Sequence, residues 1–79
     1  MTNVDITYDP SVDAAYISLT GGIEPGSSAT MYACDPSKVG GMINLDFDHE
    51  GRLIGVEVLG ASGKLPRLLL DAARRPDTG

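Results

Sequence analysis

The chain has 79 residues, of which 42% are hydrophobic and 22% charged, a composition typical of one small globular domain and not of a disordered segment. Its formal net charge is −5, because residues 1–62 carry nine acids against Lys38 and Arg52, whereas residues 63–79 carry four basic residues against two acids. The excess of acidic residues in residues 1–62 repels phosphates, which excludes nucleic acid as a primary ligand.

Two strands are predicted in the first twenty residues. Residues 3–8 alternate polar and apolar side chains with period two, as a strand with one wet face does. Asp9 and Pro10 supply turn chemistry, and the alternation resumes over residues 13–19, with Tyr16 facing outward. A helix over residues 11–17 is the alternative, because Ser11 could cap it and two alanines favour it. We favour the strand.

A second hairpin and a short edge strand are predicted in the middle of the chain. Residues 20–41 are rich in glycine, proline and serine, and only residues 29–34 there suit a strand, which we expect to be a short edge strand. Residues 42–48 and 53–59 alternate clearly on either side of a turn that ends at Gly51, which predicts a hairpin. Gly55 in the return strand predicts a bulge or the close approach of another group.

The period changes to that of a helix over about residues 63–75. Pro66 suits its first turn and Pro76 ends it. Leu70 lies off the apolar stripe, so we expect it to be exposed beside Tyr16 as part of a dimer or partner surface. The stripe that we expect to cover one face of the sheet comprises Leu65, Leu68, Leu69, Ala72 and Ala73.

These elements predict a single α+β domain over residues 1–79. The small antiparallel sheet, over about residues 3–60, has four strands, or five with the edge strand, and one C-terminal α-helix packs on one face. A domain of this size buries only about 60% of the surface of its unfolded chain, so we expect a homodimer. Cys34 is the only cysteine, and the chain has no leader-like segment or long apolar run, so we expect a cytoplasmic protein without membrane association.

Three segments of the chain are similar to a known family. They are residues 8–17, which begin with Tyr8 and Asp9, residues 45–53, which close on Gly51 and Arg52, and residues 54–62. In their order and spacing they resemble the small prokaryotic family catalogued as domain of unknown function 2283. The resemblance implies a small sheet with a helix, no established activity and, for some relatives, a proposed antitoxin-like role. Residues 23–41 are longer and richer in glycine than the connection in that family.

The hairpin also matches the ligand spacing of a calcium-binding EF-hand, from Asp46 through Asp48 and Glu50 to Glu57. An EF-hand requires a helix on each side, whereas both flanking segments alternate as strands. We therefore expect no resident metal or other cofactor. A weak surface cation site on Asp46, Asp48 and Glu50 is the alternative.

The sequence lacks an evident catalytic set. His49 is the only histidine and Cys34 the only cysteine, so neither finds a second such group for a zinc site or for nucleophilic catalysis. The leading hypothesis is therefore a noncatalytic interaction module, an antitoxin-like or regulatory partner of a basic protein. Its acidic sheet face would carry Asp5, and its partner or dimer surface comprises Tyr16, Leu70, Asp46, Asp48 and Glu57. The alternative is a metal-dependent protein or enzyme with a site assembled across a dimer around Asp46, Asp48, Glu50 and His49.

Overall fold

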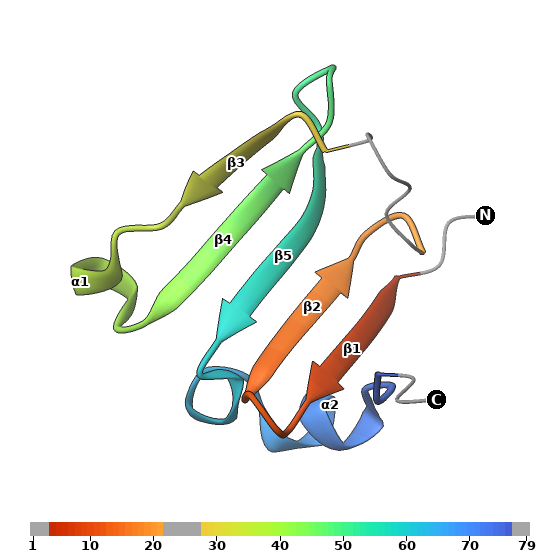
Figure 1. The fold of residues 1–79 in the computed structure, drawn as a ribbon, viewed down its shortest axis with the longest axis vertical. Coiled ribbons are helices and arrows are strands. Elements are labelled where there is room, and N and C mark those ends of the chain that lie inside the picture. Colours follow the sequence, from red (N-terminus) through yellow and green to blue (C-terminus); the bar gives the residue numbers. More distant parts are fainter. Residues whose placement is uncertain (1–3, 22–27, 77–79) are drawn as a thin grey trace.

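A computed structural model of the chain describes residues 4–21 and 28–76. Within these residues, five strands form one sheet in the order β1-β2-β5-β4-β3, and every neighbouring pair is antiparallel (Figure 1). The elements are β1 (Asp5–Asp9), β2 (Ala14–Ser18), β3 (Thr30–Ala33), α1 (Pro36–Val39), β4 (Met42–Phe47), β5 (Leu53–Leu59), the 3-10 turn η1 (Ala61–Gly63) and α2 (Arg67–Ala72). The predicted antiparallel sheet with a C-terminal helix is confirmed, as is the edge strand.

Both predicted hairpins are present, and side chains in their turns bind the backbone. In the turn between β1 and β2, Asp9 accepts a hydrogen bond from the Ser11 N–H (3.0 Å), and Asp13 takes a left-handed φ of 54°. The alternative helix over residues 11–17 is wrong, because this turn is followed directly by β2. Between β4 and β5, Asp48 accepts from the N–H groups of Glu50 and Arg52. Aspartate side chains that accept hydrogen bonds from backbone N–H groups therefore shape both turns.

Alternation along the strands makes the two faces of the sheet chemically different. The packed face carries Ala15 and Val58, which are directly opposite in the register and belong to the core cluster with Ala61 and Leu70. The other face, which we call the polar face, is defined by the side chains of Tyr16, Asn44, Asp46 and Glu57, with Gly55 among them.

The C-terminal helix is shorter than predicted and buries a different side. α2 spans only Arg67–Ala72, because the preceding residues form η1 and then an extended Pro66 (φ −58°, ψ 142°). Leu70, expected to be exposed, is only 3% exposed and packs against the sheet, whereas Leu68, expected to cover the sheet, is 83% exposed. The run of three leucines fits either of two stripes, so the direction in which the helix docks decides which one is buried.

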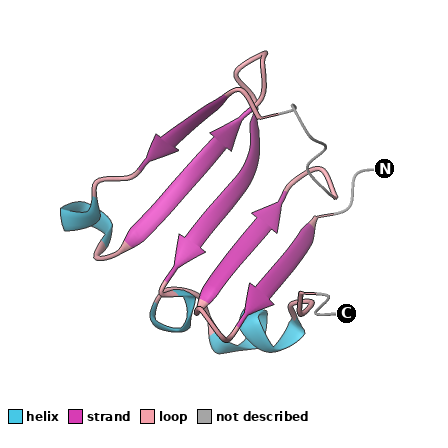
Figure 2. Ribbon diagram, viewed as in Figure 1, coloured by secondary structure: helices cyan, strands magenta, loops and turns pink. Residues whose placement is uncertain are grey.

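The short helix reaches only one corner of the sheet. Figure 2 shows α2 at the ends of β1 and β2 and away from β3 and β4. Beyond α2 the chain runs beside β1, where the Arg74 N–H donates to Ile6 O (2.8 Å) and the Tyr8 N–H donates to Arg74 O (2.8 Å). The Arg74 guanidinium also bonds both carboxylate oxygens of Asp5. The C-terminal segment therefore closes the β1 edge of the sheet.

Helix α1 was not among the predicted elements. Asp35 caps it by accepting from the N–H of Ser37 (3.0 Å), Pro36 is its first residue, and Gly40 ends it with a left-handed φ of 72°. Aspartate, proline and glycine are common in turns as well as at the ends of helices. A single helical turn is therefore hard to distinguish from a loop by sequence. None of the described helices is long and apolar enough to cross a lipid bilayer.

Candidate functional site

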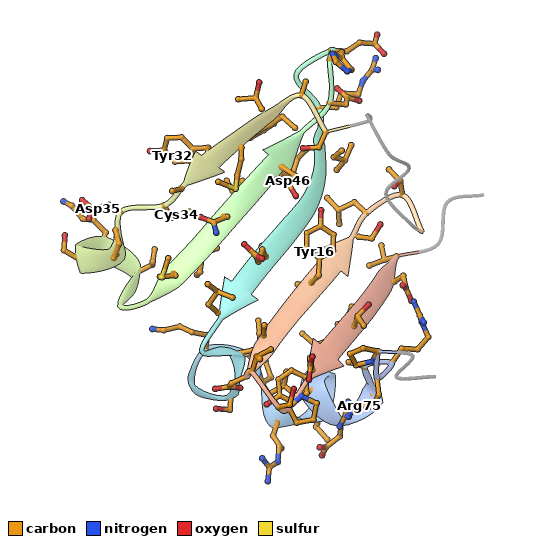
Figure 3. The ribbon with its side chains drawn as sticks, viewed as in Figure 1. Tyr16, Tyr32, Cys34, Asp35, Asp46 and Arg75 are labelled. Atoms are coloured by element: carbon orange, nitrogen blue, oxygen red, sulfur yellow. The ribbon has the colours of Figure 1, made fainter. Side chains whose placement is uncertain are left out.

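The centre of the polar face is a tyrosine that lies across a neighbouring strand. Tyr16 on β2 extends over Gly55 on β5, and its hydroxyl donates a hydrogen bond to Asp46 Oδ2 on β4 (2.7 Å; Figure 3). A Cβ atom on Gly55 would lie 1.8 Å from the Tyr16 hydroxyl oxygen, so only glycine leaves room for the ring. Of the two alternatives predicted at Gly55, a bulge or a close approach, the close approach is present, and the approaching group is Tyr16. The register of β4 and β5 also shifts next to Gly55, where Asp46 is opposite Gly55 but Phe47 is opposite Leu53.

Burial and the nearby carboxylate both act on Tyr16. Desolvation, followed by the hydrogen bond to Asp46, raises the pKa of the Tyr16 hydroxyl far above its ordinary value. The phenol therefore stays protonated at physiological pH and serves as a hydrogen-bond donor to Asp46.

A second carboxylate is held on the same face. Asn44 on β4 lies directly opposite Glu57 on β5, and its side-chain amide donates to Glu57 Oε1 (2.8 Å). Asn44 is only 9% exposed, so its side chain is held in place. Glu57 is in turn directly opposite Tyr16. Two carboxylates, Asp46 and Glu57, are thus oriented by neutral donors on adjacent strands.

Among the described residues, no cation forms an ion pair with either of these two carboxylates. In the described part of the chain, the ion pairs join Arg52 to Glu50, Arg67 to Asp71 and Arg74 to Asp5, and none involves Asp46 or Glu57. Asp5, expected on the acidic face, is instead neutralised by Arg74, whose hydrogen bond lowers the pKa of the Asp5 carboxyl. The uncompensated charge of the polar face therefore resides on Asp46 and Glu57.

Two exposed methionines flank the carboxylates. Met31 on β3 lies directly opposite Asp46, and Met42 precedes Asn44 by two residues on β4, so both share the polar face. Their exposed fractions are 59% and 54%. The polar face therefore combines a fixed pair of anionic groups with flexible apolar side chains at its border.

The family described as "Protein of unknown function (DUF2283)" matches residues 5–62 of the chain. The chain belongs to this family. The match runs from β1 to η1 and so includes all the residues that define the polar face, whereas α2 lies outside it. No curated protein and no solved structure matches the chain.

The tyrosine–aspartate turn of this DUF2283 protein has a structural role that its sequence does not reveal. The Tyr8 hydroxyl donates to Asp13 Oδ1 (2.7 Å), and Asp13 also accepts from the N–H (2.9 Å) and hydroxyl (2.7 Å) of Ser62. Asp13 therefore ties the first hairpin to η1, and the hydrogen bonds from Ser62 and Tyr8 lower the pKa of its carboxyl. Arg75 stacks over the Tyr8 ring at 5.2 Å from its centroid.

The aspartate-rich hairpin of the family places its acids in separate environments. Asp48 binds the backbone of its own turn, which lowers the pKa of its carboxyl, and Glu50 pairs with Arg52 at 3.0 Å. Asp46 is engaged with Tyr16 on the sheet. Among the residues that the structure describes, no three side chains of His, Cys, Asp or Glu lie where they could together hold a metal ion.

The structure thus groups only part of the predicted partner surface. Tyr16, Asp46 and Glu57 lie together on the polar face, whereas Leu70 is buried under the packed face and Asp48 is at the hairpin turn. Asn44 was missed, although its alternation with Asp46 places it on the same face. Met31 and Met42 were missed as well, since exposure in a β-strand depends on which neighbours the fold supplies.

Proposed function

We propose that this DUF2283 protein is a noncatalytic interaction module that binds a basic segment of a partner protein on the polar face of its sheet. The observation that supports this function is the pair of carboxylates on Asp46 and Glu57, which are held by Tyr16 and Asn44 and have no described cation beside them. An antitoxin-like or regulatory pairing with a small basic protein is one form of such binding, and the family resemblance is its only support.

The arrangement suits a cationic side chain with an apolar stem. The carboxylates on Asp46 and Glu57 are already oriented, so binding a lysine or arginine costs little further side-chain entropy on this side of the complex. The stem of the bound side chain can lie against Met31 or Met42, whose thioethers adapt to different shapes. The net charge of −5 also speeds the approach of a basic partner.

An interaction surface fits the polar face better than a catalytic site does. The carboxylates project from the middle of a β-sheet, where extended or helical segments can lie across several strands. Tyr16 remains protonated and is committed to Asp46, so it is not available as a base at physiological pH.

The proposal is tested with fluorescein-labelled octa-arginine as the probe, by fluorescence anisotropy at low and high salt. The site variant is Asp46→Asn with Glu57→Gln, which keeps the shape of both side chains. The matched control is Glu50→Gln with Asp71→Asn, which removes the same charge from exposed ion pairs elsewhere.

We expect the site variant to bind about tenfold more weakly than the wild type, since each of its two lost charge pairs contributes about 0.7 kcal/mol. The control should remain within about twofold, because its carboxylates lie outside the polar face. Equal weakening of both variants would show that only net charge matters and would refute the proposed site. Failure of the wild type to bind the probe at low salt would refute it too.

A further inference from the structure

The two outer edges of the sheet differ in whether a described segment forms backbone hydrogen bonds with them. The β1 edge is closed by the C-terminal segment through two backbone hydrogen bonds between Arg74 and β1. β3 is the outermost strand on the other side, and no described segment pairs with its outer edge (Figure 1). An unpaired strand edge is a template for a further strand.

The backbone groups that point outward from β3 can be identified from the register. The Cys34 N–H donates to Ile43 O (2.8 Å), so Cys34 directs its backbone groups toward β4. These directions alternate along an antiparallel strand. The backbone N–H and C=O groups of Tyr32 therefore also point toward β4, whereas those of Met31 and Ala33 point outward. No hydrogen bond to these outward groups exists among residues 4–21 and 28–76.

The side chains of β3 leave this edge open to pairing. All four residues of the strand are exposed, and none is charged or a proline, although lysine and proline are the residues that usually protect an edge. Tyr32 is 60% exposed and Met31 59%. Figure 3 shows Tyr32 on this outermost strand, shortly before Cys34.

We infer that two copies of this chain join through β3, antiparallel, with the twofold axis at Tyr32. In this register Met31 of one copy pairs with Ala33 of the other, and the reciprocal pair is identical. The outward groups of Met31 and Ala33 then form four backbone hydrogen bonds. The two Tyr32 side chains face each other in the closer, non-hydrogen-bonded pair, where aromatic pairs stabilise a sheet.

A second copy fits this edge for three reasons. The outward groups of Met31 and Ala33 are placed symmetrically about Tyr32, so β3 is complementary to itself. The strand is uncharged, so two chains that each carry a net charge of −5 can meet there without placing like charges face to face. Each copy also has a thin core, with no large side chain below 2% exposure among those described, so additional burial stabilises it.

The proposed dimer is one continuous sheet made of two five-stranded sheets. Directly paired residues point to the same side of a sheet, so both polar faces lie on one side of the dimer. The association itself does not involve Asp46 or Glu57, and its test is therefore independent of the proposed function.

The first test is the mass in solution, measured by sedimentation across a range of protein concentrations. We expect the wild type to reach twice the monomer mass of 8.3 kDa. Tyr32→Lys should be a folded monomer, because it places two positive charges at the twofold axis while position 32 is exposed in a single copy. Leu68→Lys is the matched control, with the same charge change on an exposed residue of α2, and should stay dimeric.

A backbone variant tests the hydrogen bonds directly. Ala33→Pro removes one outward N–H and leaves the inward-facing groups of Tyr32 and Cys34 in place, so it should also be a folded monomer by circular dichroism and sedimentation. A monomeric wild type, dissociation of Leu68→Lys, or a dimeric Ala33→Pro would each overturn the inference.

The second test fixes the register by cross-linking in a Cys34→Ser background. Tyr32→Cys should form an intermolecular disulfide, because the proposed pair brings two Cα atoms to about 4.5 Å, close to the usual range for disulfides. Met31→Cys should not, since its two copies would be offset by two residues, roughly 8 Å apart. Cross-linking by Met31→Cys in place of Tyr32→Cys would overturn the register.

Discussion

Tyr16 on β2 donates a 2.7 Å hydrogen bond to Asp46 on β4, although β5 lies between these two strands. The contact is possible because the intervening residue is Gly55, whose missing side chain leaves space for the phenol. A side-chain bond therefore spans three strands and holds Asp46 in place on the polar face. The stability of the sheet and the orientation of this carboxylate depend on the same glycine.

Gly55→Ala is expected to destabilise the protein by about 1–3 kcal/mol, because the added Cβ would overlap the Tyr16 hydroxyl and force the ring out of its position. Urea unfolding measures this loss. Gly63→Ala is the control, since a Cβ there meets no atom within 4 Å, and its effect should stay within about 0.5 kcal/mol. If Tyr16 is the cause, combining Gly55→Ala with Tyr16→Ala should cost less than the sum of the two single changes.

The alkaline stability of the protein should depend on Tyr16. Its pKa is raised in the folded state, so the protein favours the neutral phenol, and this contribution is complete below the ordinary tyrosine pKa of 10.0 and is lost as the pH rises above it. Tyr16→Phe should therefore lose less unfolding free energy than the wild type between about pH 8 and pH 11. Urea unfolding at both pH values measures the difference, and an equal loss in the two proteins would contradict the assignment.

Asp13 should contribute stability that is lost as the pH falls, whereas the contribution of Tyr16 is lost as the pH rises. Hydrogen bonds from Ser62 and Tyr8 lower its pKa, so its contribution is complete above the ordinary value of 3.8 and is lost as the pH falls through the lowered pKa. Asp13→Asn tolerates the left-handed backbone but removes the charge. Its thermal midpoint should be lower than that of the wild type at about pH 7 and closer to it at about pH 3. Asp71→Asn, at an exposed helix position, should leave the wild-type profile unchanged.

The helix orientation is tested by two substitutions of neighbouring leucines. Leu70→Ala should cost about 2–5 kcal/mol, because Leu70 is 3% exposed and packs in the core cluster. Leu68→Ala should change the unfolding free energy by no more than about 0.5 kcal/mol, because Leu68 is 83% exposed. Urea unfolding of both variants is the measurement. The reverse order of effects would support the stripe that the sequence alone suggests.

The local pattern was sufficient to predict the hairpins and the edge strand. The period of two over β4 and β5 depends on successive residues pointing to opposite faces, and the turns depend on aspartate and glycine within a few positions. The same alternation predicts that Asp46 and Glu57 lie on one face of the sheet. Gly55 in a strand predicts a bulge or a close approach, but the local pattern does not indicate that Tyr16 is the group that approaches.

Contacts between distant segments were beyond such reasoning. The pairing of β2 with β5 brings Tyr16 to Asp46, and these two residues are 30 positions apart in the chain. The interruption at Pro66 and the docking direction of α2 decide that Leu70 is buried and Leu68 exposed. The ion pair of Arg74 with Asp5, which removes Asp5 from the acidic surface, likewise joins opposite ends of the chain.

The sequence by itself determined which segments are strands and which side chains share a face, because the geometry of a single strand and a single turn is set by neighbouring residues. Only the tertiary structure decided the order of the strands, the side of α2 that is buried, and which sheet edge has no pairing partner among the described residues. Each of these depends on packing and hydrogen bonds between segments far apart in the chain, and the local period carries no information about such distances.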